Sequence, residues 1–279
     1  MSVIMGRRMA MLGLCCAPVA RRPAWAEEKT VVLASTTSVE NSGLLAHLLP
    51  LFTTQTGIAV RVLALGTGQA LAVTARGDAD LVLVHDPEAE QRFMDQGYGA
   101  ERHEVAWNDF IIVGPASDPA RVAGGRDAAT ALSAIWAARA PFVSRGDSSG
   151  THALEQRLWH TAGLDPLRSG GGWYRDIGGG MGAALNAAAA MEAYTLSDRG
   201  TWLAFGNKRG LRILVEGGHA LLNRYSVIVP NPAGHRPEGR DPARRLAAWL
   251  LSPTGQTAIG AHMLAGERLF HPVADPKPD

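Results

Sequence analysis

One stretch of the sequence places an arginine, hydroxyl side chains and two glycines where a strand would pass into a helix. Residues 144–152 read SRGDSSGTH. The first turn of a helix leaves backbone N–H groups free and carries the positive end of the helix dipole. Arg145 adds a planar cationic fork, and Ser149 and Thr151 add hydroxyl donors. A set made of donors indicates an anion-binding site. The alternative is an ordinary helix cap by Ser149, with Arg145 at the surface.

Two earlier turns have the same character. Residues 35–38 are four consecutive hydroxyl side chains, STTS, directly after an expected strand, and residues 66–69 read GTGQ after another. Each turn by itself is equally typical of a helix cap. Strand-to-helix turns of this kind can face one another across a cleft, so the three together favour an anion site over three unrelated caps.

A fourth cluster has two interpretations. Asp78, Asp80, His85 and Asp86 lie close together in the chain and could form a metal site or an acid–base pair. Asp86 also stands directly before Pro87, as expected of a helix cap with proline in the first turn. The sequence favours the cap. The nine histidines include no HExxH pair, so we predict no metal site and no cofactor.

Enzymatic alternatives find little support. Ser148 and Ser149 lack the GxSxG context of a nucleophile elbow, and no GK[ST] motif of a P-loop occurs. His152, three residues after Ser149, has no evident place as a base. We therefore predict no catalytic residue and no enzymatic activity, and keep a secreted hydrolase as the alternative.

Strand-like and helix-like segments alternate along the chain. Strands are expected at residues 31–35, 58–64, 81–84, 141–144 and 211–215, and helices at 42–55, 69–76, 87–96, 128–138, 151–162, 183–193, 241–251 and 252–264. Two similar apolar runs, residues 110–115 and 225–230, each end in proline. This pattern predicts an α/β protein of two lobes, each a mostly parallel sheet flanked by helices. Two crossing strands would join lobe I (residues 27–113 plus 227–279) to lobe II (residues 114–226), with the ligand in the cleft.

The first 26 residues are typical of a signal peptide. Arg7 and Arg8 precede an apolar run at residues 9–20, and an Ala-Trp-Ala sequence ends at residue 26. The run is too short to span a bilayer. A buried N-terminal helix is the alternative, and the export route stays open. A lipoprotein would need a small residue before Cys15, where Leu14 stands.

Composition excludes several classes. The chain has 279 residues, 46% hydrophobic and 19% charged, with a net charge of +1, which is a globular composition without the basic excess of a nucleic-acid binder. Both cysteines lie within the first 26 residues. Without that segment the chain has 23 basic and 26 acidic residues and cannot form a disulfide.

In order and in combination, these motifs resemble the tungstate-binding proteins of bacterial ABC importers (TupA-like), within the class of periplasmic oxyanion-binding proteins. The matching segments are residues 35–38, 41–45, 66–70, 80–86, 108–115, 144–152, 194–201 and 223–228. The resemblance implies a periplasmic-binding-protein-like fold. It also implies a monomeric, periplasmic receptor that delivers a tetrahedral oxyanion to a membrane permease and its ATPase.

The resemblance also implies which residues bind the oxyanion. From lobe I they are Thr36, Thr37, Ser38 and Thr67; from lobe II they are Arg145, Ser149, Gly150 and Thr151, with Thr195 and Ser197 as further donors.

The choice of tungstate over molybdate rests on the resemblance alone, and sulfate and phosphate remain alternatives. Phosphate keeps a proton near neutral pH, so its site gains from a carboxylate acceptor, whereas a carboxylate repels a dianion that has no proton. Asp147 is the only acid in the three turns, and we predict that it points away and braces its loop.

Overall fold

The computed structural model describes residues 29–147, 149–168, 171–233 and 237–277. The predicted signal peptide, residues 1–26, lies outside these ranges. Among the described residues, no helix is both long and apolar enough to cross a membrane.

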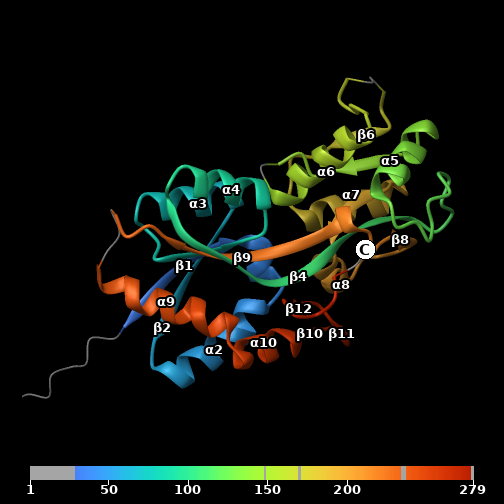
Figure 1. Ribbon diagram of the computed structural model, residues 1–279. Helices are drawn as coiled ribbons and strands as arrows, with labels where there is room; N and C mark the ends of the chain where they lie inside the picture. Colours follow the sequence, from blue (N-terminus) through green and yellow to red (C-terminus); the bar gives the residue numbers. More distant parts are fainter. Residues whose placement is uncertain (1–28, 148, 169–170, 234–236, 278–279) are drawn as a thin grey trace, which may run out of the picture.

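A mixed sheet forms the larger part of the molecule (Figure 1). Its strands, in spatial order, are β12 (His271–Pro272), β4 (Gly99–Pro115), β9 (Leu222–Pro230), β3 (Leu81–Val84), β1 (Thr30–Thr36) and β2 (Ala59–Leu65). β2, β1 and β3 are parallel, as predicted, whereas β9 joins β3 and β4 joins β9 antiparallel. A parallel core therefore meets the two long strands that leave it.

Helices cover both faces of this sheet. They are α1 (Thr37–Asn41), α2 (Leu44–Thr56), α3 (Thr67–Ala75), α4 (Pro87–Asp95), α9 (Pro237–Leu251) and α10 (Pro253–Gly260). Successive side chains of a strand point to opposite faces. Leu33 accordingly packs in one cluster with Phe52 and Leu246, and Ala34 packs in another with Ala70 and Phe93.

A second group of elements surrounds the far end of β4. Its strands are β5 (Phe142–Ser144), β6 (Tyr174–Asp176), β7 (Thr195–Asp198) and β8 (Leu211–Val215), and its helices are α5 (Ala128–Ala137), α6 (Gly150–Thr161), α7 (Met181–Met191) and α8 (Arg199–Ala204). Ile112 of β4 packs with Phe142 and Trp159, while Ile111 packs with Leu185 of α7 on the other face. The remaining short elements are η1 (His219–Leu221), β10 (Met263–Leu264) and β11 (Glu267–Arg268).

Two strands connect the two groups. β4 and β9 run side by side from one group to the other in Figure 1, paired from Gly99 with Pro230 to Asp109 with Leu222. The hydrophobic clusters change between Ala106 and Phe110 on β4. The lobe boundaries after residues 113 and 226 stay a prediction, and the packing changes a few residues earlier.

β4 begins 11 residues before the predicted run at 110–115. Its first residues, GAERHEV, carry charges that hide a strand from a search for apolar runs. Pairing with β9 supplies the hydrogen bonds that make them a strand.

Candidate anion-binding site

The turns after β1, β2 and β3 meet at one edge of the sheet. The three strands are parallel, so their carboxyl ends share an edge, and the register pairs Thr36 with Leu65. Thr36 and Thr67 are therefore neighbours at this edge, and His85 follows β3 at the same level. Both threonines are buried, at 3% and 5% exposure.

The four hydroxyl side chains of residues 35–38 differ in their hydrogen bonds and their burial. Ser35 donates to the carbonyl oxygen of Leu83 at 2.8 Å, so its hydroxyl is committed to the sheet. Thr36 caps α1 by accepting from the Val39 N–H at 3.2 Å, which leaves its own O–H free to donate. Thr37 is exposed and Ser38 half-buried in the first turn of α1.

Arg145 is the one buried cation of the predicted set. It is 7% exposed; its Nη2 donates to Asp147 at 2.5 Å and its Nη1 to Thr151 Oγ1 at 3.5 Å. Its Nε is buried and has no hydrogen-bond partner among the described residues. An unsatisfied N–H of a buried charged group is costly. The geometry therefore fits a site in which a further acceptor meets this guanidinium.

The prediction for Asp147 holds only in part: Asp147 braces its loop, but its carboxylate engages Arg145 of the predicted site instead of pointing away. It accepts from Arg145, from the Ser149 N–H at 3.2 Å and from the Ser149 hydroxyl at 2.5 Å. Burial acts to raise the pKa of Asp147, but the Ser149 hydrogen bonds and the Arg145 charge outweigh it and lower that pKa. Because the Ser149 oxygen also caps α6 at the His152 N–H (3.2 Å), this hydroxyl is fully used inside the loop.

Gly146 determines the path of the loop. Its φ is +63°, a conformation that L side chains rarely adopt. A Cβ at this position would also lie 1.2 Å from the Asp176 carboxylate oxygen Oδ1. Only glycine allows the chain to turn here between Arg145 and Asp147.

The N-terminus of α6, from the group of elements around the far end of β4, lies close to the N-terminus of α3 on the larger sheet. A Cβ on Gly150, at the start of α6, would lie 3.6 Å from Thr67 Oγ1 and 3.7 Å from His85 Cε1. The N-termini of α6 and α3 therefore face one another, which the one-dimensional pattern predicted for these turns. Two positive helix ends with free N–H groups at one point are suited to an anion.

An ion-pair group also joins the two sides. Arg157 of α6 lies 3.6 Å from Asp86 and 3.4 Å from Glu88, at the start of α4. Glu88 and α6 line a groove of about 600 Å³. Asp86 caps α4 through the Ala89 N–H at 3.3 Å, so the interpretation of Asp86 as a cap is confirmed.

Thr151, Thr195 and Ser197 are buried, at 2%, 1% and 0% exposure. The Thr195 and Ser197 hydroxyls donate to the carbonyl oxygens of the next residues at 3.5 and 3.0 Å. β7 runs parallel to β5 through the bridge of Phe142 with Tyr194, so Ser197 lies toward the strand ends that carry the Arg145 loop. The role of these three residues as ligands stays a prediction.

His85 was absent from the predicted set, yet it lies at the junction. It is 6% exposed, its Nδ1 lies 3.0 Å from Asn223 Oδ1, and its ring stacks on Tyr225 at 4.9 Å. The signal that finds it is the rule used for the other turns, because His85 directly follows a parallel strand. Asn223 and Tyr225 come from the crossing strand β9, which no local motif could associate with the turn.

A buried acid supports α6 from behind. Glu155 is 2% exposed and accepts from the Tyr174 hydroxyl at 2.8 Å and from Trp159 Nε1 at 3.3 Å. Burial raises the pKa of Glu155 to about 7, although these hydrogen bonds act to lower it. His152 Nδ1 lies 3.2 Å from Ser144 Oγ and 4.0 Å from a Glu155 oxygen.

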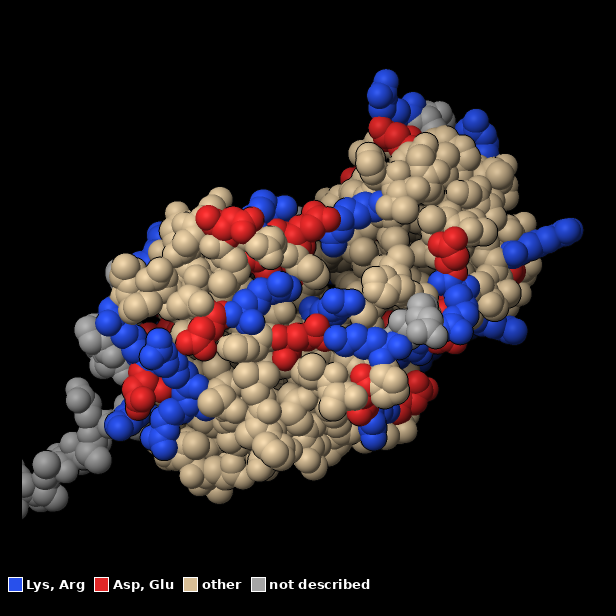
Figure 2. Space-filling view, viewed as in Figure 1, with Lys and Arg blue, Asp and Glu red and all other residues tan. Residues whose placement is uncertain are grey.

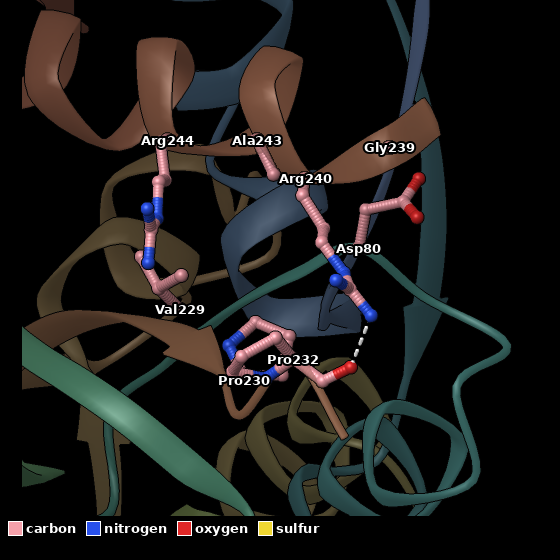
Figure 3. Close-up of a pocket in the computed structure, with 8 residues that line it drawn as sticks. All are labelled: Asp80, Val229, Pro230, Pro232, Gly239, Arg240, Ala243 and Arg244. Atoms are coloured by element: carbon pink, nitrogen blue, oxygen red, sulfur yellow. Dashed lines mark hydrogen bonds between the residues drawn. The ribbon is translucent and has the colours of Figure 1, made fainter. Parts of the chain in front are cut away.

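A separate cavity of about 250 Å³ lies between α9 and the end of β9. Figure 3 shows Arg240 and Arg244 reaching into it from α9, with Arg240 donating to the Pro232 carbonyl oxygen. Asp80, on its wall, accepts from the Val32 N–H at 2.8 Å. Because Asp80 precedes β3 and His85 follows it, this cavity lies at the opposite edge of the sheet from the three turns.

The visible surface carries charges of both signs. On the face shown in Figure 2, acidic and basic side chains lie interleaved, and the surface is hollowed between the two groups of elements. The face shown therefore offers an approaching anion mixed charge rather than a broad basic area.

Comparisons with known proteins identify relatives of this chain. A family model described as a PBP superfamily domain matches residues 23–254. The chain is 42% identical to the tungstate-binding protein TupA of Peptoclostridium acidaminophilum over 98% of both chains. It is 44% identical to a putative ABC transporter anion-binding protein of Haloferax volcanii, over 88% of this chain and 72% of that protein. The solved structure of TupA from Desulfovibrio alaskensis G20 aligns with a TM-score of 0.80 and 43% identity, covering 88% of this chain and 99% of that one.

Proposed function

The chain belongs to the PBP superfamily and to the family of TupA tungstate-binding proteins, and from this premise we propose that it captures tungstate and delivers it to an ABC importer. Its class is that of an oxyanion-binding receptor. Relatives named as tungstate-binding support tungstate as the ligand. The partners would be a membrane permease and its ATPase, the location periplasmic and the working form a monomer.

The observation that carries this proposal is the unsatisfied Nε of the Arg145 guanidinium. This buried N–H has no partner among the described residues, and Nη1 of the same side chain lies 3.5 Å from Thr151 in the first turn of α6, whose start meets Thr67. Tetrahedral dianions need several converging donors and no acceptor. We assign the ligand set as Thr36, Thr37, Ser38, Thr67, Arg145, Ser149, Gly150, Thr151, Thr195 and Ser197.

The residues of this set differ in whether their donors are already used in hydrogen bonds within the protein. The Thr36 and Thr67 hydroxyls and the N–H groups at the start of α6 would bind the anion directly. Ser149 would contribute its hydroxyl only after its bond to Asp147 breaks. The acid of the Arg145 loop, Asp147, is engaged with its own loop.

The geometry also argues against a hydrolase. In a Ser-His-acid triad the serine and the acid bond to opposite ring nitrogens. Here Ser144 and Glu155 both lie nearest Nδ1 of His152. This arrangement does not support such a triad, and we propose that the protein binds and releases its ligand unchanged.

The test is calorimetric titration of the purified protein with tungstate, molybdate, sulfate and phosphate in one buffer. We expect one-to-one binding that is strongest for tungstate and far weaker for sulfate and phosphate. Equal binding of tungstate and molybdate would widen the ligand to both oxyanions. The absence of heat with all four would refute an anion site at these turns.

A further inference from the structure

His85 occupies a position from which it can touch the ligand. Its Cε1 lies 3.7 Å from the Cβ position of Gly150, and that same position is 3.6 Å from Thr67 Oγ1. Cε1 is bonded to both ring nitrogens, and Nδ1 is engaged with Asn223, so Nε2 is the nitrogen beside Cε1 that can serve the two helix starts. The Asn223 contact at 3.0 Å is the only hydrogen bond of the ring among the described residues, and it uses Nδ1.

The network behind the ring determines which nitrogen carries hydrogen. The Asn223 amide nitrogen donates to Asn108 Oδ1 at 2.8 Å and to the Tyr225 hydroxyl at 2.7 Å. Its oxygen is therefore the atom that faces His85, and an oxygen can only accept. Nδ1 of His85 carries the hydrogen, and in the neutral ring Nε2 presents a lone pair to the cleft.

Charges reach the ring from several elements. Asp86, which caps α4, and Asp198 at the end of β7 act to raise the pKa of His85, while Arg145 acts to lower it. Burial is the largest influence and lowers that pKa overall. Asp86 is paired with Arg157 and Asp198 caps α8, so each acid already has a partner. The free protein thus holds His85 neutral near pH 8.

A dianion changes this balance. Tungstate and molybdate carry no proton near neutral pH, so an oxygen of either ion would face the bare lone pair of Nε2 unfavourably. A proton on Nε2 turns the same atom into a donor and adds a positive charge beside the anion. The bound dianion also offsets the influence of Arg145 on the ring.

We propose that His85 is an anion-binding residue whose Nε2 takes a proton from solvent when the site closes on a fully deprotonated oxyanion. The captured dianion therefore enters together with one proton. This inference rests on the proposed function, because it requires an oxyanion between α3 and α6. It makes affinity fall as the pH rises above the range in which the free ring can be protonated.

The experiment measures the proton directly. Tungstate is titrated into the purified protein at pH 8 in two amine buffers, Tris and imidazole, which differ in heat of protonation. We expect uptake of about one proton per anion bound, and about a tenfold loss of affinity per pH unit above pH 8. Tight binding with no proton uptake would overturn the role of His85 and leave the proposed function standing. No binding at all would overturn both.

Variants identify the group that takes the proton. His85→Gln keeps a donor but cannot titrate, so proton uptake is expected to vanish and the pH dependence to flatten. His103→Gln is the matched control, because His103 is exposed on β4 and bonds to Glu101. Uptake that persists in His85→Gln would assign the proton to another group and refute the inference.

A measurement on the unaltered protein covers the case in which the variant misfolds. The ¹⁵N shifts of the histidine rings report which nitrogens carry hydrogen. We expect one ring to change from an Nδ1–H form to a doubly protonated form when tungstate is added at pH 8. A His85 ring that stays neutral in the complex would overturn the proposal.

Discussion

The two sides of the proposed site hold their candidate anion donors in different ways. On the side of β1 and β2 the donors are neutral, and the O–H of Thr36 remains free after the oxygen has capped α1. On the side of α6 the donors include a full charge, Arg145, and a carboxylate that already engages it. Asp147 also holds both donors of Ser149.

If the proposed ligand set is correct, this difference means that the two sides would bind the anion by different routes. Thr36 and Thr67 can add a hydrogen bond to an arriving oxyanion at little cost. In the Arg145 loop, the donors of Arg145 and Ser149 already bond to Asp147. They would have to leave Asp147 before they could bind the anion. The threonine side would therefore supply hydroxyl donors that need no rearrangement. The Arg145 side would supply a positive charge that Asp147 partly neutralises until the anion arrives.

The strongest test of this contrast removes the charge. Arg145→Ala deletes the guanidinium and leaves Asp147 as an unpaired acid beside the site. We expect a loss of at least about 100-fold in tungstate affinity, since hydrogen bonds to charged groups contribute about 1.5–3 kcal/mol each. Titration calorimetry measures it, with circular dichroism to check the fold.

Arg244→Ala is the matched control for this variant. Arg244 lies in the cavity at the opposite edge of the sheet, so its loss should leave affinity unchanged. Wild-type affinity in a folded Arg145→Ala protein would show that Arg145 does not bind the anion. The proposed difference between a neutral and a charged side would then be wrong.

A smaller effect is expected from the neutral side. Thr67→Val keeps the shape of the side chain and removes one hydroxyl donor. The expected loss is at least about tenfold in affinity, in line with about 1.5–3 kcal/mol for one hydrogen bond to a charged partner. Thr54→Val on the exposed face of α2 is the control, because its hydroxyl bonds only to the Pro50 carbonyl oxygen among the described residues. Equal affinities for the two variants would exclude the Thr67 hydroxyl as a ligand.

Neutralising the competing acid should act in the opposite direction. Asp147→Asn removes a negative charge near the anion while its side-chain oxygen can still accept from the Ser149 N–H. We expect affinity to rise about threefold to tenfold, about 1 kcal/mol of relieved repulsion at a partly exposed position. Asp78→Asn, an exposed residue paired with Arg76, should change nothing. A clear drop in affinity for Asp147→Asn would mean that the bracing role outweighs the competition.

Substitution of Glu155 is expected to have the smallest effect on anion affinity. Its effect should appear in the pH dependence of stability. Its pKa is raised from 4.5 to about 7, so the folded protein favours the protonated form. The free energy of unfolding should therefore fall as the pH rises from about 4.5 to 7, by up to about 1.4 kcal/mol per pH unit. Glu155→Gln should remove this fall and leave affinity within about twofold. Urea unfolding at pH 5, 6, 7 and 8 measures both proteins, and parallel profiles would contradict the assignment.

The parts of the fold that follow local rules were predictable. The parallel strands β1, β2 and β3, the cap by Asp86 and the brace by Asp147 each depend on residues a few positions apart. The first half of β4 was not predictable, because its charged residues form a strand only through pairing with β9.

The candidate site divides in the same way. Residue types and spacing determined that three turns are rich in donors and that each opens a helix. Only the tertiary structure decided that Gly150 lies close to both Thr67 and His85, and that the His85 ring contacts Asn223. The physical reason is that local sequence governs capping and turns within a few residues. Contacts across 65 to 138 positions, in contrast, arise from the packing of the strands that bring them together.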